Sequence, residues 1–466
     1  MNIIPKLSEF YYIGKGYMPE NADIVRINDD RFAREEYDIE ISTKQITVKS
    51  ATDEGYYRAM TTLRMLMDYN KEIRVCHIHD KPRFSYRAFM IDSARHMQSI
   101  EEIKKMINAA AQFKFNVFHW HLCDDQGYRI ESTSLPELNI IGSYRKNDRF
   151  GKIRSDSRYG GYYTKDEIRD IVAYAKERYI EVVPEIDMPG HTTAIISTYP
   201  NVSCEGKKID VRCTGGIFPE ILCAGNDETF ELIYKILDEV IELFPGDYVH
   251  IGGDEAPKIK WKNCEKCQKR MKDHQLKNEE ELQGWFMNKV ADYLSSKGKK
   301  TISWNESLKS GILSSDIIVQ QWLKGEKAVT KHVNNGGSAI FSDFGHVYLD
   351  YPHSFTPLDK VYSYKPIFKH IRSEENILGI DSPLWTEFIT NDDRLEYLAY
   401  PRLCAVSEIA WSDEKSRNYD DFLKRLDAVM PIFEKLNINV APKSDWHRTP
   451  EGVRKTIEFF INITRH

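Results

Sequence analysis

The chain has 466 residues, a formal net charge of −6 and 41% hydrophobic residues. This length is too great for one ordinary compact domain and suits a barrel-sized domain with a smaller one beside it. Charges of both signs are mixed without a basic tract, which argues against nucleic acid and anionic membrane as partners. Apolar runs stay below the roughly 18 residues of a membrane-spanning helix.

The chain starts with MNIIPKLSEFYY, which has neither the basic segment nor the apolar core of a secretory signal. The sequence as it stands therefore predicts a cytoplasmic location, or a secreted or periplasmic one if a signal peptide has been removed. The eight cysteines are spread along the chain, unlike those of a disulfide scaffold. Cys264 and Cys267 form a CxxC pair without a second pair at zinc-ribbon spacing. We interpret them as free thiols, with a structural metal or a local disulfide as alternatives.

Residues 1–82 have the pattern of a small α/β domain. Alternating apolar residues predict strands at 23–28, 36–42, 45–49 and 74–79. Between the third and fourth strands, residues 53–68 repeat apolar side chains at helical spacing. Lys81, Pro82 and Arg83 mark the predicted domain boundary.

From residue 83, predicted strands and helices alternate, which is the signature of βαβ units. The predicted strands are 86–91, 115–122, 180–187, 248–251, 301–305, 316–322, 338–344 and 377–385. The predicted helices are 99–113, 164–179, 228–244, 279–295, 326–334 and 394–410. The pattern predicts a (β/α)8 TIM barrel over residues 83–440, with long loops. Helices at 419–436 and 450–463 are expected to pack outside the barrel, and residues 441–466 are expected to form a C-terminal helical extension.

The fourth predicted strand ends in two glycines and two acids. Gly252 and Gly253 allow a turn or the close approach of a ligand, and Asp254 and Glu255 follow directly. Two adjacent acids after a strand often only cap the next helix. In a barrel, however, the C-terminal strand ends carry the active site. The other strand ends therefore decide between these interpretations.

Polar or aromatic residues stand at every predicted strand end. They are Asp92, Arg95, His119, His121, Asp124, Glu185, Asp187, His191, Asp254, Glu255, Trp304, Gln321, Trp322, Tyr348, Asp350, Trp385 and Glu387. The motifs are His119-Trp-His-Leu-Cys-Asp-Asp-Gln-Gly, Pro184-Glu-Ile-Asp-Met-Pro-Gly-His, His250-Ile-Gly-Gly-Asp-Glu, Tyr348-Leu-Asp and Trp385-Thr-Glu. With these motifs the sequence resembles glycoside hydrolase family 20, the β-N-acetylhexosaminidases, over nearly its whole length.

The resemblance implies an exo-acting enzyme that removes terminal β-linked N-acetylglucosamine or N-acetylgalactosamine from glycans, without cofactor or metal. Adjacent residues of an extended chain point to opposite faces. Asp254 and Glu255 are therefore badly placed to flank one bond about 5–5.5 Å apart, as acid and nucleophile of a retaining glycosidase. The resemblance implies instead that the substrate's 2-acetamido oxygen attacks and forms an oxazolinium intermediate. Glu255 is then the general acid and base, and Asp254 orients the acetamide.

Further roles follow from the same resemblance. Trp304, Trp322 and Trp385 are expected to wall the N-acetyl group and sugar, although strand-end tryptophans also serve as plain core. Tyr348 is expected to bind the acetamide oxygen. The expected sugar-binding side chains are Arg95, Asp124, His191, Asp350 and Glu387, and the supporting ones are Asp187 and His250. A structural ion pair of Arg95 with Asp92 or Asp124 and a surface or structural role for Asp125 are open alternatives.

Two rival functions belong to other classes. His119 and His121 share one face of a strand and are candidate zinc ligands of a metal-dependent hydrolase. A catalytically silent sugar-binding protein is the second rival. Cys123, Tyr128 and Phe344-Gly-His differ from the residues that the family most often has near the substrate entrance. The sequence does not determine which glycosidic linkage is cleaved, which of the two sugars is preferred or what the oligomeric state is.

Overall fold

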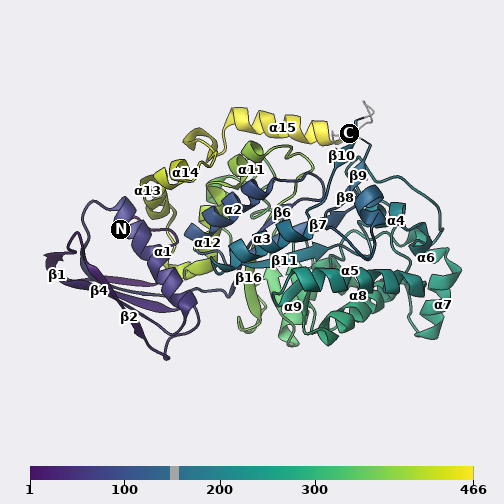
Figure 1. The fold of residues 1–466 in the computed structure, drawn as a ribbon, viewed down its shortest axis with the longest axis horizontal. Helices are drawn as coiled ribbons and strands as arrows, with labels where there is room; N and C mark the ends of the chain where they lie inside the picture. Colours follow the sequence, from purple (N-terminus) through teal and green to yellow (C-terminus); the bar gives the residue numbers. More distant parts are fainter. Residues whose placement is uncertain (147–156, 465–466) are drawn as a thin grey trace.

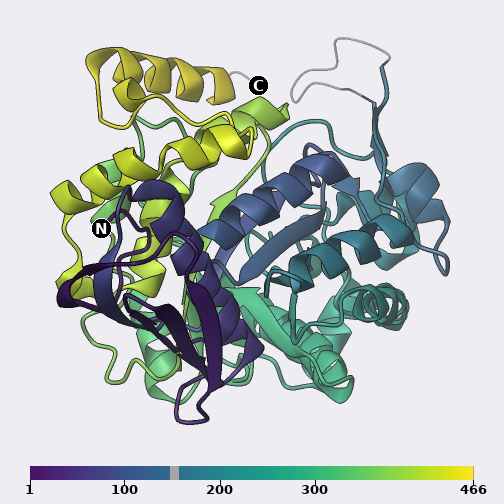
Figure 2. The same ribbon diagram turned by 60° about the vertical axis from the view of Figure 1, so that its left-hand side comes forward.

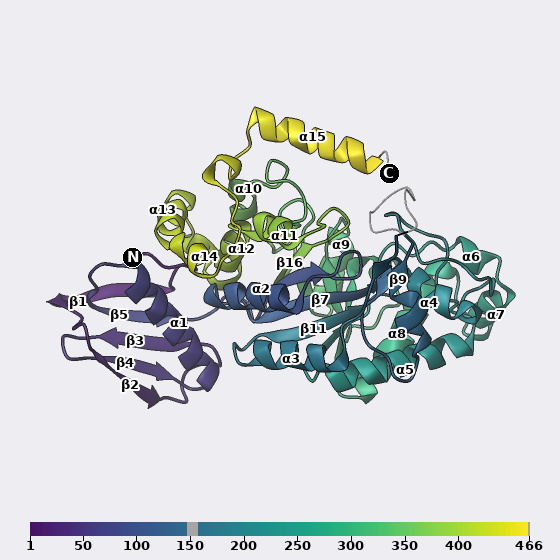
Figure 3. The same ribbon diagram turned by 45° about the horizontal axis from the view of Figure 1, so that its top comes forward.

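The computed structural model describes residues 1–146 and 157–464. Figures 1 and 3 show an N-terminal α/β layer beside a larger barrel. The layer's sheet has the order β1-β5-β3-β4-β2, with α1 packed on it. Its elements are β1 (Glu9–Tyr17), β2 (Asp23–Asn28), β3 (Tyr37–Ile41), β4 (Gln45–Ser50), α1 (Asp53–Tyr69) and β5 (Arg74–Asp80). The sequence did not predict β1, because this edge strand is mostly exposed and lacks an apolar alternation.

Parallel strands close the barrel, in the order β11-β12-β13-β14-β15-β16-β6-β7, and β7 pairs with β11. They are β6 (Tyr86–Asp92), β7 (Val117–Asp124), β11 (Glu181–Ile186), β12 (Tyr248–His250), β13 (Lys300–Trp304), β14 (Ile318–Gln321), β15 (Ala339–Phe341) and β16 (Ile377–Leu384). The predicted TIM barrel after a small α/β domain is therefore confirmed.

Helices surround these strands. Those that alternate with the strands are α2 (Ile100–Gln112), α3 (Lys165–Lys176), α5 (Asp227–Leu243), α8 (Glu279–Ser296) and α9 (Glu326–Asn334), and α12 (Arg402–Trp411) follows the last strand. The side chains of Ser99 and Thr164 accept from the backbone N–H groups of Glu102 and Glu167, as their capping motifs predict. Shorter helices are α4 (Thr193–Thr198), α6 (Ile259–Lys262), α7 (Glu265–Asp273), α10 (Leu358–Tyr362) and α11 (Asp392–Ala399).

Beyond the barrel lie α13 (Tyr419–Val429), α14 (Pro431–Lys435) and α15 (Pro450–Thr464). Two predicted helices are each two helices. Residues 394–410 divide at Pro401 and residues 419–436 at Pro431, because proline has no backbone N–H to continue the ladder. Figure 2 shows α15 lying above the rest of the molecule. Short elements are β8 (Gly127–Tyr128), β9 (Tyr144–Arg145), β10 (Tyr159–Gly160), a π-helical turn (Leu138–Gly142) and 3-10 turns at Pro200–Val202, Asn305–Ser310, Glu414–Ser416 and Lys443–Asp445.

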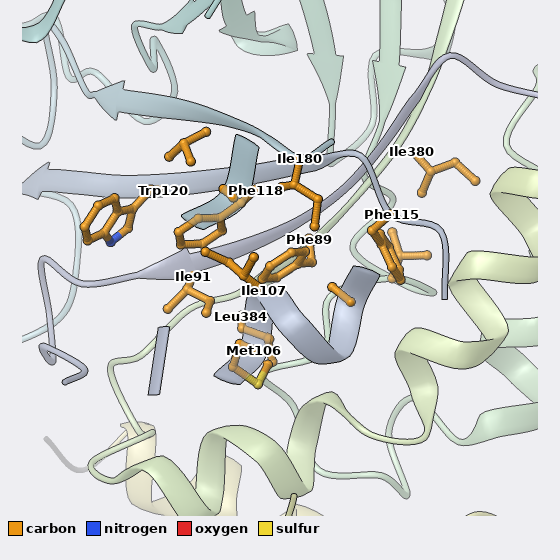
Figure 4. Close-up of a cluster of buried hydrophobic side chains, with 14 of the residues drawn as sticks. Phe89, Ile91, Met106, Ile107, Phe115, Phe118, Trp120, Ile180, Ile380 and Leu384 are labelled. Atoms are coloured by element: carbon orange, nitrogen blue, oxygen red, sulfur yellow. The ribbon is translucent and has the colours of Figure 1, made fainter. Parts of the chain in front are cut away.

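The apolar layer between strands and helices gives the barrel its rigidity. Phe89, Phe118 and Trp120 stack in series, with ring centroids 5.1 and 5.6 Å apart. Figure 4 shows Met106 and Ile107 of α2 against these strand residues. This packing fixes the strand ends that carry the polar side chains. In the described residues, the helices are too short or too polar to cross a membrane.

Candidate active site

A pocket of about 380 Å³ lies at the C-terminal ends of the barrel strands. This volume falls within the roughly 300–1,000 Å³ of typical small-molecule sites. Its lining comprises Arg95, Asp124, Asp187, His191, Gly215, Gly216, Asp254, Glu255, Trp322, Phe344, Tyr348, Asp350, Tyr351, Trp385, Glu387, Phe388 and Phe459. Most of the sequence-predicted site residues are therefore brought together.

The two acids after β12 both line this pocket. Gly252 and Gly253 have φ values of 62° and 105°, and Glu255 itself has a φ of 42°. The left-handed backbone at Glu255 turns the chain, so the expectation of opposite faces, which assumed an extended chain, is wrong here. The next helix begins only at Ile259. The two acids are therefore not its cap.

Asp254 lies deeper than Glu255. The side chain of Asp254 is 13% exposed and that of Glu255 is 32% exposed. Burial raises the pKa of Asp254 to about 7, against the lowering effect of His191 and with a further rise from Glu255. Among the described atoms, Asp254 Oδ1 is buried without a hydrogen-bond partner. A buried acceptor facing a pocket is suited to a donor from a ligand.

His191 connects the acids on two strand ends. Its Nδ1 lies 3.1 Å from Asp125 Oδ2 and 3.3 Å from Asp124 Oδ1, and its Nε2 lies 3.5 Å from Glu255 Oε2. Burial lowers the pKa of His191, but the surrounding carboxylates outweigh it and raise this pKa well above its usual value. Asp125 is buried and accepts a hydrogen bond from the Thr193 backbone N–H at 3.0 Å. Asp125 is thus the structural half of its pair.

Arg95 lines the same pocket and shares Asp124 with His191. Its Nη2 lies 2.6 Å from Asp124 Oδ2 and 3.8 Å from Glu387 Oε1, and its Nη1 lies 3.2 Å from Asp92 Oδ2. Its guanidinium sits 5.1 Å from the ring centroid of Trp385. The ion pairs considered as an alternative to sugar binding are therefore present. They hold Arg95 at the pocket, where it still contributes to the lining.

Aromatic rings form the remaining wall. The rings of Trp322 and Tyr348 stack with centroids 6.1 Å apart. Within the part of the chain that the structure describes, Trp322 Nε1 and Asp350 Oδ1 are buried polar atoms without a partner. Burial and the carboxylate of Glu387 raise the pKa of Asp350 well above its usual value. A donor and an acceptor are therefore available to a polar ligand.

Trp304 is placed differently from the expectation. It is 1% exposed, lies outside the pocket lining and donates from Nε1 to Glu185 at 2.7 Å. Its ring centroid is 6.1 Å from that of Trp385. Trp304 therefore packs behind Trp385 and is held there by its hydrogen bond to Glu185, instead of lining the pocket. His250 lies in the same layer, with Nδ1 3.0 Å from Glu185.

The histidines of β7 also lie beneath the pocket. His121 has one ring nitrogen 2.5 Å from Glu185 and the other 3.0 Å from Asp124. His119 Nδ1 lies 2.7 Å from Asp381, and both histidines are fully buried. A catalytic zinc keeps a coordination position open to substrate. The buried, carboxylate-bound pair favours an interior packing role over the metal-hydrolase alternative.

Sequence reasoning missed several lining residues. Gly215, Gly216 and Phe388 lie in loops without a periodic pattern, and Tyr351, which follows Asp350 beyond the seventh predicted strand, was given no role. Phe459 comes from α15, a helix expected to pack outside the barrel; it contributes to the pocket instead, 5.3 Å from Phe388 between ring centroids. Its apolar helical pattern resembles that of an ordinary packing helix, so no sequence signal marked it.

A larger cavity, of about 850 Å³, lies at the other end of the barrel. It is lined by Tyr86, Val117, Glu181 and Tyr248, near the N-terminal strand ends, and by Arg34 of the N-terminal layer. Barrel enzymes place their chemistry at the C-terminal face. The smaller pocket, which holds the clustered acids, is therefore the candidate active site.

Comparisons with known proteins identify relatives of both parts of the chain. A model of the glycosyl hydrolase family 20 catalytic domain matches residues 84–414, and a model of that family's domain 2 matches residues 10–81. A β-hexosaminidase of Porphyromonas gingivalis is 37% identical over 87% of this chain and 54% of its own length. The chain thus spans about half of that relative. A β-hexosaminidase of Vibrio furnissii is 35% identical over 83% of this chain and 67% of its own length.

The fold has a close counterpart among solved structures. A GH20 exo-β-N-acetylglucosaminidase from Vibrio harveyi, in complex with N-acetylglucosamine, superimposes with a TM-score of 0.84 at 29% identity. The match covers 95% of this chain and 78% of that one. The resemblance noted in the sequence motifs is confirmed, and it extends through both domains.

Proposed function

Because this chain belongs to glycosyl hydrolase family 20, we propose that it is a β-N-acetylhexosaminidase. Its substrates are glycans with a terminal non-reducing β-linked N-acetylglucosamine or N-acetylgalactosamine, released with retention of configuration. The Vibrio harveyi relative in complex with N-acetylglucosamine supports this substrate class. The observation that carries the proposal is the placement of Asp254 and Glu255 in one pocket at different depths.

Glu255 serves as the general acid and base. Its more exposed carboxyl group lies toward solvent, where a leaving group departs and a water enters. His191 lies 3.5 Å away and is held cationic by Asp124 and Asp125, so it orients the Glu255 carboxyl group. Glu255 protonates the glycosidic oxygen in the first step and deprotonates water in the second.

Asp254 serves as the partner of the substrate's acetamide. The acetamide N–H donates to Asp254, and this holds the carbonyl oxygen for attack on the anomeric carbon. Positive charge that develops in the oxazolinium intermediate is stabilised by the carboxylate. The unpartnered Oδ1 supports this assignment, since a buried acceptor gains most from a ligand donor.

A panel of 4-nitrophenyl glycosides tests the proposal. We expect hydrolysis of the N-acetyl-β-glucosaminide and N-acetyl-β-galactosaminide, much slower hydrolysis of the plain β-glucoside, and competitive inhibition by a thiazoline mimic of the oxazolinium ion. Equal rates on the β-glucoside and its N-acetylated counterpart would exclude the substrate-assisted route. Sugar binding without turnover of any substrate would instead support a silent sugar-binding protein.

A further inference from the structure

Four cysteines from two loops of the barrel domain meet in one cluster. They are Cys204, Cys223, Cys264 and Cys267, and their sulfur atoms all lie within 4.8 Å of one another. Cys204 and Cys223 supply the second pair that the CxxC motif lacks in sequence. We propose that these four thiolates bind one structural zinc ion that joins the loops following β11 and β12.

The sulfur positions have the spacing of a tetrahedral site. The Sγ–Sγ distances are 3.8 Å for Cys204–Cys267, 3.8 Å for Cys223–Cys264 and 3.6 Å for Cys223–Cys267. A zinc–sulfur bond of about 2.3 Å places the sulfurs of a tetrahedral site about 3.8 Å apart. One sulfur close to two others at this distance matches a shared central ion. Paired disulfides would instead bring each sulfur to about 2 Å from a single partner.

The surroundings suit a closed structural site. Cys223 and Cys267 are fully buried, Cys264 is 8% exposed, and Cys204 is partly exposed and leaves an entry path. A zinc ion with four thiolates carries a net charge of −2. Residues 258–272 contain seven Lys or Arg side chains and one acid, Glu265, and Lys260 lies close enough to Cys204 to interact with it electrostatically.

The two loops are already fitted to each other around the cluster. The indole N–H of Trp261 donates to the Leu222 carbonyl at 2.9 Å. Gly225 lies so close to the CxxC backbone that an added Cβ would be 2.1 Å from the carbonyl carbon of Lys266. Lys260 and Glu205 form an ion pair of 2.6 Å across the same junction. The ligands are therefore presented by two loops whose mutual position is set.

The zinc would affect substrate binding indirectly, through the position of a pocket wall. The segment between Cys204 and Cys223 carries Gly215 and Gly216, which line the sugar pocket. Its two ends are held by ligands, so the metal fixes this wall and the loop that follows Glu255. Loss of the metal is expected to raise KM more than it lowers kcat, because the carboxyl groups themselves stay on the barrel strands.

The first experiment measures metal in the full chain purified without chelator. We expect one zinc per chain by elemental analysis, and eight thiols after denaturation in chelator under anaerobic conditions. A preparation free of zinc, one loaded with iron instead, or one with only four titratable thiols would overturn the proposal. Cobalt exchange adds a test without mutation, because a tetrahedral cobalt–thiolate site absorbs strongly in the near ultraviolet and visible.

Variants locate the site. Cys204→Ser, at the most exposed ligand, and Cys267→Ser should each lose zinc and lower Tm. Cys213→Ser is the matched control, because Cys213 lies in the same loop but outside the cluster, and it should retain zinc and Tm. Full zinc content in both ligand variants would contradict the assignment. These readouts are metal content, spectrum and Tm, so they stand whether or not the proposed activity is found.

Discussion

Asp187 lies against Gly252 so closely that position 252 has no room for a side chain. An added Cβ at Gly252 would be 1.6 Å from Asp187 Oδ1, and the next backbone N–H, of Gly253, donates to that oxygen at 3.1 Å. Burial and the Asp254 carboxyl group raise the pKa of Asp187 well above its usual value. Asp187 therefore holds the turn that delivers Asp254 and Glu255 to the pocket.

Replacing Gly252 with Ala should abolish most of the activity. The new methyl group must displace Asp187, and the φ of 62° is itself strained for alanine, by about 1–2 kcal/mol. We expect a large fall in kcat/KM together with a lower Tm. Gly298→Ala is the control, because Gly298 has a similar φ of 78° with nothing within 4 Å of an added Cβ. Similar losses in both variants would show that backbone strain alone is responsible.

The Asp254→Asn variant should lose activity on N-acetylated substrates by about 10²–10³-fold, the scale of a lost charge-stabilising group. Asp254 must be ionised to stabilise the intermediate, and its pKa is about 7. The kcat/KM of the unmodified protein should therefore fall as the pH drops below about 7. In Asp254→Asn this acid limb should be absent. An acid limb of unchanged position in the variant would assign it to another group.

The Asp254→Asn substitution should increase stability at alkaline pH, although it lowers activity. A carboxyl group whose pKa rises from 3.8 when unfolded to about 7 when folded binds its proton more tightly in the native state. Its contribution to the free energy of unfolding is greatest below pH 3.8 and falls as the pH rises to about 7. Above that, the buried charge costs up to about 4 kcal/mol at roughly 1.4 kcal/mol per pH unit. Asp254→Asn should thus raise Tm at pH 8 and not at pH 4; an unchanged Tm at pH 8 would contradict this.

The fold could be predicted from the sequence because the strands and helices of a barrel have periodic patterns of apolar residues. The turn at Glu255 was not readable, since the sequence shows two adjacent acids but not the left-handed φ that puts both in one pocket. Trp304 illustrates a second limit: its strand was predicted to end at residue 305 and ends at Trp304, but a strand end alone does not show whether its side chain lines the pocket or lies beneath it. The meeting of Cys204 with Cys267 depends on loop packing, for which the chain has no periodic signal.

Glu255→Gln should remove proton transfer and leave sugar binding intact. We expect a loss of about 10²–10⁴-fold on substrates with a poor leaving group, the usual range for general acid catalysis. An activated dinitrophenyl leaving group needs no acid, so the first step should recover. Azide should then accelerate turnover and yield a β-glycosyl azide, because azide attacks the intermediate without a base. Glu231→Gln is the control, since Glu231 is exposed on α5 and lies outside the pocket lining; failure of azide to act would argue against this role for Glu255.

Phe459 offers a test of the contribution of α15. Its ring centroid lies 6.1 Å from that of Tyr351 and 5.3 Å from that of Phe388, at a pocket wall supplied by a helix above the barrel. Phe459→Ala should weaken binding of substrates with a sugar leaving group by about fivefold, which corresponds to about 1 kcal/mol for a lost aromatic contact.

The same variant should leave inhibition by free N-acetylglucosamine unchanged, because we expect that ligand to occupy the deeper part of the pocket, near Asp254 and Trp385. Ile457→Ala is the matched control on the same helix, since Ile457 is 55% exposed and lies outside the lining. A fivefold weakening of the free sugar would place Phe459 against the terminal residue instead. Equal KM values in both variants would show that Phe459 of α15 does not contribute to substrate binding.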